Sequence, residues 1–119
     1  MAKRHDDLEA RLSRKREITI TVTGRKSGRN ISLPVWFVLN DGKLYLLPVK
    51  GSDTQWYKNV LQKASIRIDA GEAKTELKVV AVTDAAEVKS VVEKFREKYG
   101  TSGVNLYSKF DVAVIAQTR

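Results

Sequence analysis

The chain has 119 residues, of which 42% are hydrophobic and 30% are charged. This length and composition are typical of one compact domain with a single core. The absence of cysteine excludes disulfides, thiol nucleophiles and iron–sulfur or structural zinc sites, and the one histidine is His5, near the terminus. The sequence has no stretch of ~20 apolar residues, and its polar start is unlike a signal peptide. We therefore expect a cytoplasmic protein without a membrane span.

Basic residues outnumber acidic ones by 22 to 14, which gives a formal net charge of +8. The excess lies in the first half of the chain, because residues 1–16 hold six basic and three acidic side chains and residues 17–50 hold five and two. Such an imbalance favours an anionic partner. Nucleic acid, an acidic membrane surface and a phosphorylated small molecule all fit this charge.

Two different patterns occupy the start of the chain. Residues 1–16 carry Leu8 and Leu12 four positions apart among charged residues, which predicts a short surface helix or arm. In residues 17–23, isoleucine and valine alternate with threonine, which is the pattern of a strand. We therefore expect an N-terminal arm over residues 1–16 and a single domain over residues 17–119.

Residues 30–39 predict a longer strand that is apolar on both faces. Phe37 belongs to one face, whereas Pro34 and Trp36 belong to the other. Proline has no N–H to donate, so we expect a bulge or a sheet edge at Pro34, with the amides of Val35 and Trp36 open to another partner. Because a barrel interior covers only one face of a strand, we also expect a homodimer with Trp36 at its interface.

Turn and capping signals divide the rest of the chain. Residues 40–42, Asn-Asp-Gly, are a type I′ hairpin signal. Capping patterns at Ser52 and Asp84 predict two helices, which end near Ala64 and at Gly100. Further strands are predicted at residues 43–49, 65–70, 74–83 and 110–116. Six strands in antiparallel hairpins, with two inserted helices, predict a mainly β fold of the α+β class that closes as a small barrel.

The densest group of basic residues lies in the turn after the first predicted strand. Arg25, Lys26, Ser27 and Arg29 place three cations and a hydroxyl beside glycines that let backbone N–H groups approach a ligand. This combination suits phosphate. The alternative is a solvated hairpin tip, whose basic side chains prevent edge pairing.

A second candidate group surrounds the start of the first predicted helix, where a helix N-terminus attracts anions. It contains Lys50 and Gly51, followed by Trp56, Tyr57 and Asn59. Trp56 falls on the apolar face of the helix and is expected in the core. Its polar neighbours cannot all face inward, so some of them line a groove or meet solvent.

Four motifs occur in the order known from one family: Gly24 to Gly28 (GRKSG), Pro34 to Phe37, Asp41-Gly42 and Trp56 to Asn59. They resemble the deazaflavin-dependent nitroreductase family over about residues 21–71. The resemblance implies a split β-barrel similar to FMN-binding proteins. It also implies a homodimer in which a reduced deazaflavin coenzyme of the F420 type delivers hydride to a quinone, nitro compound or other unsaturated acceptor.

The same resemblance implies a cofactor site along one groove. It assigns the cofactor phosphate to Arg25, Lys26, Ser27 and Arg29. It assigns the ring system to Pro34, Val35, Trp36 and Phe37. It extends the groove along Lys50, Gly51, Trp56, Tyr57 and Asn59. Ile31 stands where the family often has arginine, and the loop before Trp56 is shorter than in the family, so FMN is an alternative cofactor.

Hydride chemistry belongs to such a cofactor, so the site needs no protein nucleophile, and the sequence singles out no catalytic residue. Proton donors are expected among Tyr45, Tyr57, Tyr99 and Tyr107. Two alternatives stay open, a non-catalytic carrier of a flavin-like anionic ligand and a basic nucleic-acid-binding barrel. The aromatic residues argue against nucleic acid, because they fall in apolar patterns and a stacking surface needs exposed rings.

Overall fold

The computed structural model describes residue 12, residues 15–70 and residues 73–118. Its strands are β1 (Ile18–Thr23), β2 (Asn30–Val35), β3 (Phe37–Asn40), β4 (Lys43–Leu46), β5 (Ser65–Ala70), β6 (Ala73–Val82) and β7 (Ala113–Gln117). The helices that position the site are the 3₁₀ turn η1 (Gly51–Asp53), α2 (Gln55–Gln62) and α3 (Ala85–Val104). The mainly β prediction with inserted helices is confirmed.

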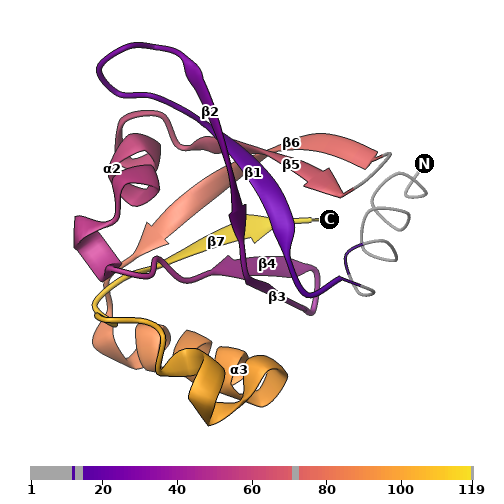
Figure 1. Cartoon of the computed structure of the whole chain (residues 1–119), viewed down its shortest axis with the longest axis vertical. Coiled ribbons are helices and arrows are strands. Elements are labelled where there is room, and N and C mark those ends of the chain that lie inside the picture. The colour runs from indigo at the N-terminus through magenta and orange to yellow at the C-terminus, as the bar shows by residue number, and fades with distance from the viewer. Residues whose placement is uncertain (1–11, 13–14, 71–72, 119) are drawn as a thin grey trace.

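All seven strands form one antiparallel sheet in the order β2-β1-β5-β6-β7-β4-β3 (Figure 1). The long strand β6 joins the two halves of the sheet, because it pairs with β5 along residues 73–78 and with β7 along residues 79–82. Strands β2 and β3 are consecutive in the chain but lie at opposite ends of the strand order. The segment that contains them therefore connects the two edges, and the sheet curls into a half-barrel consistent with a split-barrel fold.

The single strand predicted over residues 30–39 is two strands, so the prediction of six strands is wrong. Pro34 lies opposite Thr19 on the edge strand β2, where its missing N–H does not interrupt the sheet. Trp36 then leaves the strand and stacks on Tyr99 of α3, and β3 begins at Phe37. This break redirects the chain from one half of the sheet to the other.

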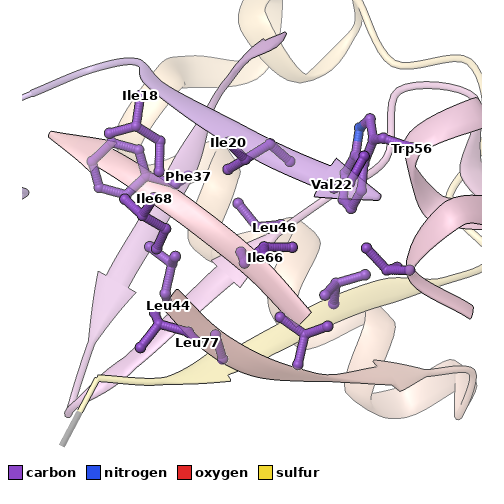
Figure 2. Close-up of a cluster of buried hydrophobic side chains, with 14 of the residues drawn as sticks. Ile18, Ile20, Val22, Phe37, Leu44, Leu46, Trp56, Ile66, Ile68 and Leu77 are labelled. Carbon is purple, nitrogen blue, oxygen red and sulfur yellow. The ribbon is translucent and has the colours of Figure 1, made fainter. Parts of the chain in front are cut away.

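The interior of the barrel is filled by one cluster of buried side chains (Figure 2). Ile18, Ile20 and Val22 point inward from alternate positions of β1, Phe37 enters from β3, and Trp56 of α2 closes one end. Burial of one such side chain stabilises the fold by about 1.5–3 kcal/mol. The alternation predicted for the first strand is confirmed, as is the core position of Trp56.

A second cluster of buried side chains lies between the outside of the barrel and α3, which runs below β3, β4 and β7 in Figure 1. Val38 of β3 and Phe95 of α3 belong to this cluster, and Trp36 packs against it. On the second apolar face predicted for residues 30–39, Val38 is thus buried and Trp36 partly covered within the chain, whereas Pro34 stays exposed. The reason for placing Trp36 at a dimer interface therefore no longer holds.

One of the two capping predictions is confirmed. The Asp84 side chain accepts a hydrogen bond from the Glu87 backbone N–H at 3.0 Å, and α3 begins at the next residue. Ser52, in contrast, lies in η1, and α2 begins three residues later, at Gln55. The prediction is wrong because the Ser52 hydroxyl bonds to Asp111 across the sequence, at 2.6 Å, instead of capping a helix.

Positive φ angles mark the turns that the sequence predicted. Asp41 and Gly42 have φ values of 54° and 74°, which confirms the hairpin between β3 and β4. Gly100 has a φ of 81° and divides α3 into two helical segments. The last strand begins only at Ala113, later than predicted, and Phe110 before it is 42% exposed.

The predicted N-terminal arm lies mostly outside the described residues, which omit residues 1–11 and 13–14. Leu12 is described, and its side chain is fully buried in the barrel cluster. Leu61 of α2 is 56% exposed. Among the described helices, none is long and apolar enough to cross a membrane.

Candidate functional site

A cavity of about 440 Å³ opens beside the break between β2 and β3. Its lining includes Pro34, Val35 and Trp36 from the break, Lys50 from the segment that leads into α2, and Trp56 from α2 itself. Two groups of residues that the sequence singled out separately therefore meet around one space. Its volume lies within the range of small-molecule and cofactor sites, which is ~300–1,000 Å³.

The wall formed by Trp36 is held by residues of α3. The Trp36 and Tyr99 rings are stacked, with centroids 4.3 Å apart and an interplanar angle of 6°. Gly103 makes room for this stack, because a Cβ atom there would lie 3.2 Å from Trp36 Cζ3 and 3.0 Å from Tyr99 Cβ. The Tyr99 hydroxyl accepts a hydrogen bond from the Phe37 N–H at 3.1 Å and lies 2.6 Å from the Arg16 carbonyl oxygen, to which it donates. This wall is therefore held in place by packing and hydrogen bonds within the chain.

Phe37, which the resemblance assigns to the ring system, points into the barrel and is fully buried. Its backbone, and not its side chain, supports the cavity, because α3 binds both of its polar atoms. Lys98 Nζ donates to the Phe37 carbonyl oxygen at 2.8 Å and lies 3.6 Å from the centroid of the Phe37 ring. Burial, together with the positive charge of Arg16, lowers the pKa of Lys98 to about 8.

The segment that contains Lys50 and Gly51 is tied to residues that precede β7. Gly51 has a φ of 55°, and a Cβ atom there would lie 2.1 Å from Asp111 Oδ1. The backbone N–H and hydroxyl of Ser52 both donate to Asp111, and Lys109 Nζ lies 3.3 Å from Asp53 Oδ2. The hydrogen bond from Ser52 is the main cause that lowers the pKa of Asp111. Glycine is thus required at position 51, and the turn around it is fixed.

Arg25 connects α2 to the basic hairpin, which is the turn of residues 24–29 between β1 and β2. The hairpin and α2 lie side by side in Figure 1. Its backbone N–H and its Nη1 donate to Asn59 Oδ1, at 3.1 and 2.8 Å, and its Nη2 donates to Gln55 Oε1 at 2.8 Å. Asn59 is buried and does not line the cavity, whereas Gln55 does. Arg25 and Asn59 therefore position the hairpin beside the cavity.

The other residues of the basic turn are exposed. The Ser27 hydroxyl accepts a hydrogen bond from the Arg29 N–H at 3.2 Å, which shapes the turn together with Gly28 at a φ of 72°. Within residues 15–70 and 73–118, the side chains of Lys26 and Arg29 form no hydrogen bond or ion pair. These two cations are free for an anionic ligand.

Tyr57 is the remaining residue that the resemblance assigns to the groove. Its side chain is only 3% exposed and belongs to the barrel core, away from the lining of the cavity. Burial raises the pKa of its hydroxyl, and the nearby charge of Asp111 raises it further. The structure thus brings together Pro34, Val35, Trp36, Lys50 and Trp56, with Gly51 adjacent, but not Phe37, Tyr57 or Asn59.

The sequence reasoning missed one whole side of the cavity. Leu106 and Tyr107 line it from the turn after Gly100, and Val49 lines it from the end of the β4 segment. Leu106 is 70% exposed and Val49 is 47% exposed, so both form an apolar rim. Residues 101–109 show no hydrophobic periodicity that would place them at the cavity. Only the hydroxyl of Tyr107, one of the four predicted proton donors, points to a function for this segment.

The remaining chemistry of the described residues is limited. In residues 15–70 and 73–118, no group of three or more His, Asp or Glu side chains is placed to hold a metal ion. The cavity itself is lined by the carboxylates of Glu17 and Asp53 and by one cation, Lys50. Phe37, Trp56 and Phe95 are buried, which disfavours a nucleic-acid stacking surface, although Phe110 is more exposed than predicted.

Solved structures of known proteins share this fold. An F420-H2-dependent reductase (FDR-A) is 20% identical, with a TM-score of 0.68, over 87% of this chain and 95% of that chain. HutZ, the heme storage protein from Vibrio cholerae, is 15% identical, with a TM-score of 0.69, over 94% and 87%. A putative pyridoxamine 5'-phosphate oxidase from Listeria innocua is 11% identical, with a TM-score of 0.68, over 95% and 90%. These likenesses confirm the split-barrel fold.

Sequence comparison adds one family. The family model described as "Uncharacterized protein conserved in bacteria (DUF2255)" matches residues 8–117, which is almost the whole chain. No curated protein matches the sequence significantly.

Proposed function

The chain belongs to the DUF2255 family, and from its split-barrel fold and its cavity we propose that it is a small flavin-type reductase. Its cofactor is a deazaflavin of the F420 type or FMN. The acceptor is a quinone, a nitro compound or another unsaturated molecule. The cofactor supplies the hydride chemistry when bound, and the protein binds, orients and shields it.

The observation that carries this proposal is the meeting of Pro34, Val35 and Trp36 with Lys50 and Trp56 around one cavity. The flat side chains of proline and tryptophan fit a planar conjugated ring. Lys50 offers a single cation to the polar edge of that ring, and the walls are held by the Trp36–Tyr99 stack. The flat side chains and the single cation that line the cavity therefore suit a flavin-type ring.

The phosphate of such a cofactor belongs outside the cavity, at the basic hairpin. Glu17 and Asp53 give the cavity two carboxylates, which repel a phosphate. Lys26 and Arg29 are exposed and have free side chains, and Arg25 fixes their turn against α2. A ligand that spans both regions has its ring in the cavity and its anionic group at Lys26 and Arg29.

Of the two backbone N–H groups predicted to contact the ring, those of Val35 and Trp36, the pairing of β1 with β2 leaves only that of Trp36. The hydrogen bond from Gly24 N–H to the Arg29 carbonyl, at 2.8 Å, sets the alternation of the β1–β2 pairing. By that alternation, Val35, opposite Ile18, faces β1 with its polar atoms. The prediction of an open Val35 amide is therefore wrong, and we assign the role of ring donor to the N–H of Trp36.

The proposal includes a homodimer. Leu106 and Val49 expose apolar surface at the rim of the cavity. A second copy of the chain packed there would bury these side chains and keep water out of the cavity. Exclusion of water matters for hydride transfer, because it prevents side reactions of the reduced cofactor.

A non-catalytic carrier is the second candidate, because the fold is shared with a heme storage protein. A carrier would retain the ring cavity and the basic hairpin but would show no turnover. The visible spectrum of the protein as purified, followed by titration with FMN and with a deazaflavin, tests ligand binding. Oxidation of the reduced cofactor by a quinone then separates a reductase from a carrier. Failure of both cofactors to bind would contradict the proposal.

A further inference from the structure

Tyr107 differs from the other tyrosines in its relation to the cavity. Tyr107 lines the cavity, whereas Tyr45 and Tyr57 do not. Tyr99 lies behind Trp36, and its hydroxyl is engaged by the backbone of Phe37 and Arg16. Among the four tyrosines, Tyr107 is therefore the one that lines the space open to a ligand.

The ring of Tyr107 is held from several sides. Its centroid lies 6.2 Å from that of Trp36, 6.1 Å from Phe95 in an edge-on contact, and 6.1 Å from Phe110. Its backbone N–H donates to the Val104 carbonyl at 3.0 Å, which closes the turn that carries it. A donor held in this way loses little conformational freedom when a ligand binds.

The hydroxyl of Tyr107 has no protein partner. The side chain is only 8% exposed, yet no hydrogen bond to the hydroxyl exists within the described part of the chain. The same residues contain no fully buried side-chain oxygen or nitrogen without a partner, so the Tyr107 hydroxyl retains accessible surface. Tyr107 belongs to the lining of the cavity. A hydroxyl without a protein partner, on a side chain that is largely buried, calls for an acceptor beside it.

We propose that Tyr107 is the hydrogen-bond donor to a carbonyl oxygen of the flat conjugated ring that occupies the cavity. The inference rests on the proposed function, because it deepens the account of what that cavity binds. The ring belongs either to the cofactor or to a quinone acceptor, which share this chemistry. Tyr107 acts here as a positioning and specificity residue, which favours oxygen-bearing rings over hydrocarbons of the same shape.

The protonation state of Tyr107 fits a donor. Burial raises the pKa of its hydroxyl well above the ordinary value, and Tyr99 adds to this effect. The hydroxyl therefore stays protonated at neutral pH and donates without carrying charge. It needs no proton exchange to do so.

The test compares two ligands of one shape, menadione and 2-methylnaphthalene, which differ in their carbonyl oxygens. Both tryptophans of the chain line the cavity, so quenching of intrinsic fluorescence reports its occupancy. Tyr107→Phe should weaken menadione binding about two- to tenfold, the value of one neutral hydrogen bond, and leave 2-methylnaphthalene binding unchanged. Tyr45→Phe, whose hydroxyl lies away from the cavity, should change neither, and thermal unfolding checks that both variants are folded.

A parallel titration with FMN identifies the source of the ring. A loss of FMN affinity in Tyr107→Phe assigns the contact to the cofactor, and a loss confined to menadione assigns it to the acceptor. Equal changes for menadione and 2-methylnaphthalene, together with unchanged FMN affinity, would overturn the inference while the proposed function stands. Binding of menadione without binding of FMN or a deazaflavin would contradict the proposed function alone. Absence of binding by every carbonyl ring would overturn both.

Discussion

Trp36 lies flat on Tyr99, although the two residues are 63 positions apart, and this contact explains why one predicted strand is two. Trp36 leaves the sheet to make the stack, and the Tyr99 hydroxyl binds the backbone of Phe37 just beyond the break. The contact therefore fixes the place where the chain passes from one half of the sheet to the other. The same place is the wall of the cavity, so the fold and the candidate site depend on one pair of rings.

The first prediction concerns Gly103, against which Trp36 packs. Gly103→Ala should lower the free energy of unfolding by about 1–3 kcal/mol, because the new Cβ atom meets Trp36 and Tyr99 at 3.0–3.4 Å. It should also change the near-UV circular dichroism of the stacked rings. Ser102→Ala, at an exposed neighbouring position, is the control. Equal stability of the two variants would show that the stack does not need this glycine.

The second prediction separates two roles within the basic hairpin. Lys26→Ala should lower the affinity for FMN or deazaflavin about ten- to a hundredfold and leave stability unchanged, because it removes a charge-assisted contact to phosphate worth about 1.5–3 kcal/mol. Arg25→Ala should lower both affinity and stability, because it also removes the bonds to Gln55 and Asn59. Lys89→Ala on α3 removes the same charge elsewhere and serves as the control. Unchanged affinity in Lys26→Ala would show that the hairpin tip is solvated surface that does not bind phosphate.

The elements whose patterns are local were predictable from the sequence. The alternation in β1, the Asp41-Gly42 turn and the Asp84 cap each depend on neighbours within a few residues, and each is confirmed. Ser52 shows the limit of such signals. Its pattern is the same as that of Asp84, but Asp111, which lies 59 positions away, provides a stronger partner for its hydroxyl.

The third prediction concerns Lys98, whose pKa falls from an ordinary 10.5 to about 8 in the folded protein. Between these two pH values the unfolded chain binds a proton that the folded protein has lost, so stability should rise with pH across this window. One proton corresponds to a slope of at most about 1.4 kcal/mol per pH unit. Urea unfolding of the wild type and of Lys98→Met from pH 7 to pH 10.5 measures the difference. Parallel curves for the two proteins would contradict the lowered pKa.

The fourth prediction tests the proposed dimer. Light scattering at micromolar concentration should give the mass of two chains for the wild type and of one chain for Leu106→Glu, because a charge in an apolar interface opposes association. Leu61→Glu is the matched control, since Leu61 is also exposed, at 56%, but lies away from the cavity. A monomeric wild type, or a Leu61→Glu variant that dissociates as readily, would contradict an interface at the cavity rim.

The candidate site was predictable only in part, for a physical reason. Residues near the hairpin and the first helix carry unusual combinations of glycine, cations and aromatics, which can be recognised without a structure. Leu106 and Tyr107 enter the cavity because the chain turns after Gly100 and packs on Trp36. That approach depends on tertiary packing, for which a short segment without periodicity contains no signal.

A crystal structure of the protein with bound FMN or deazaflavin tests the central claim most directly. We predict a ring between Trp36 and Trp56, within hydrogen-bonding distance of the Trp36 N–H, and a phosphate beside Lys26 and Arg29. A ring bound outside this cavity, or crystals that contain no ligand at concentrations that saturate other flavin-binding proteins, would contradict the account.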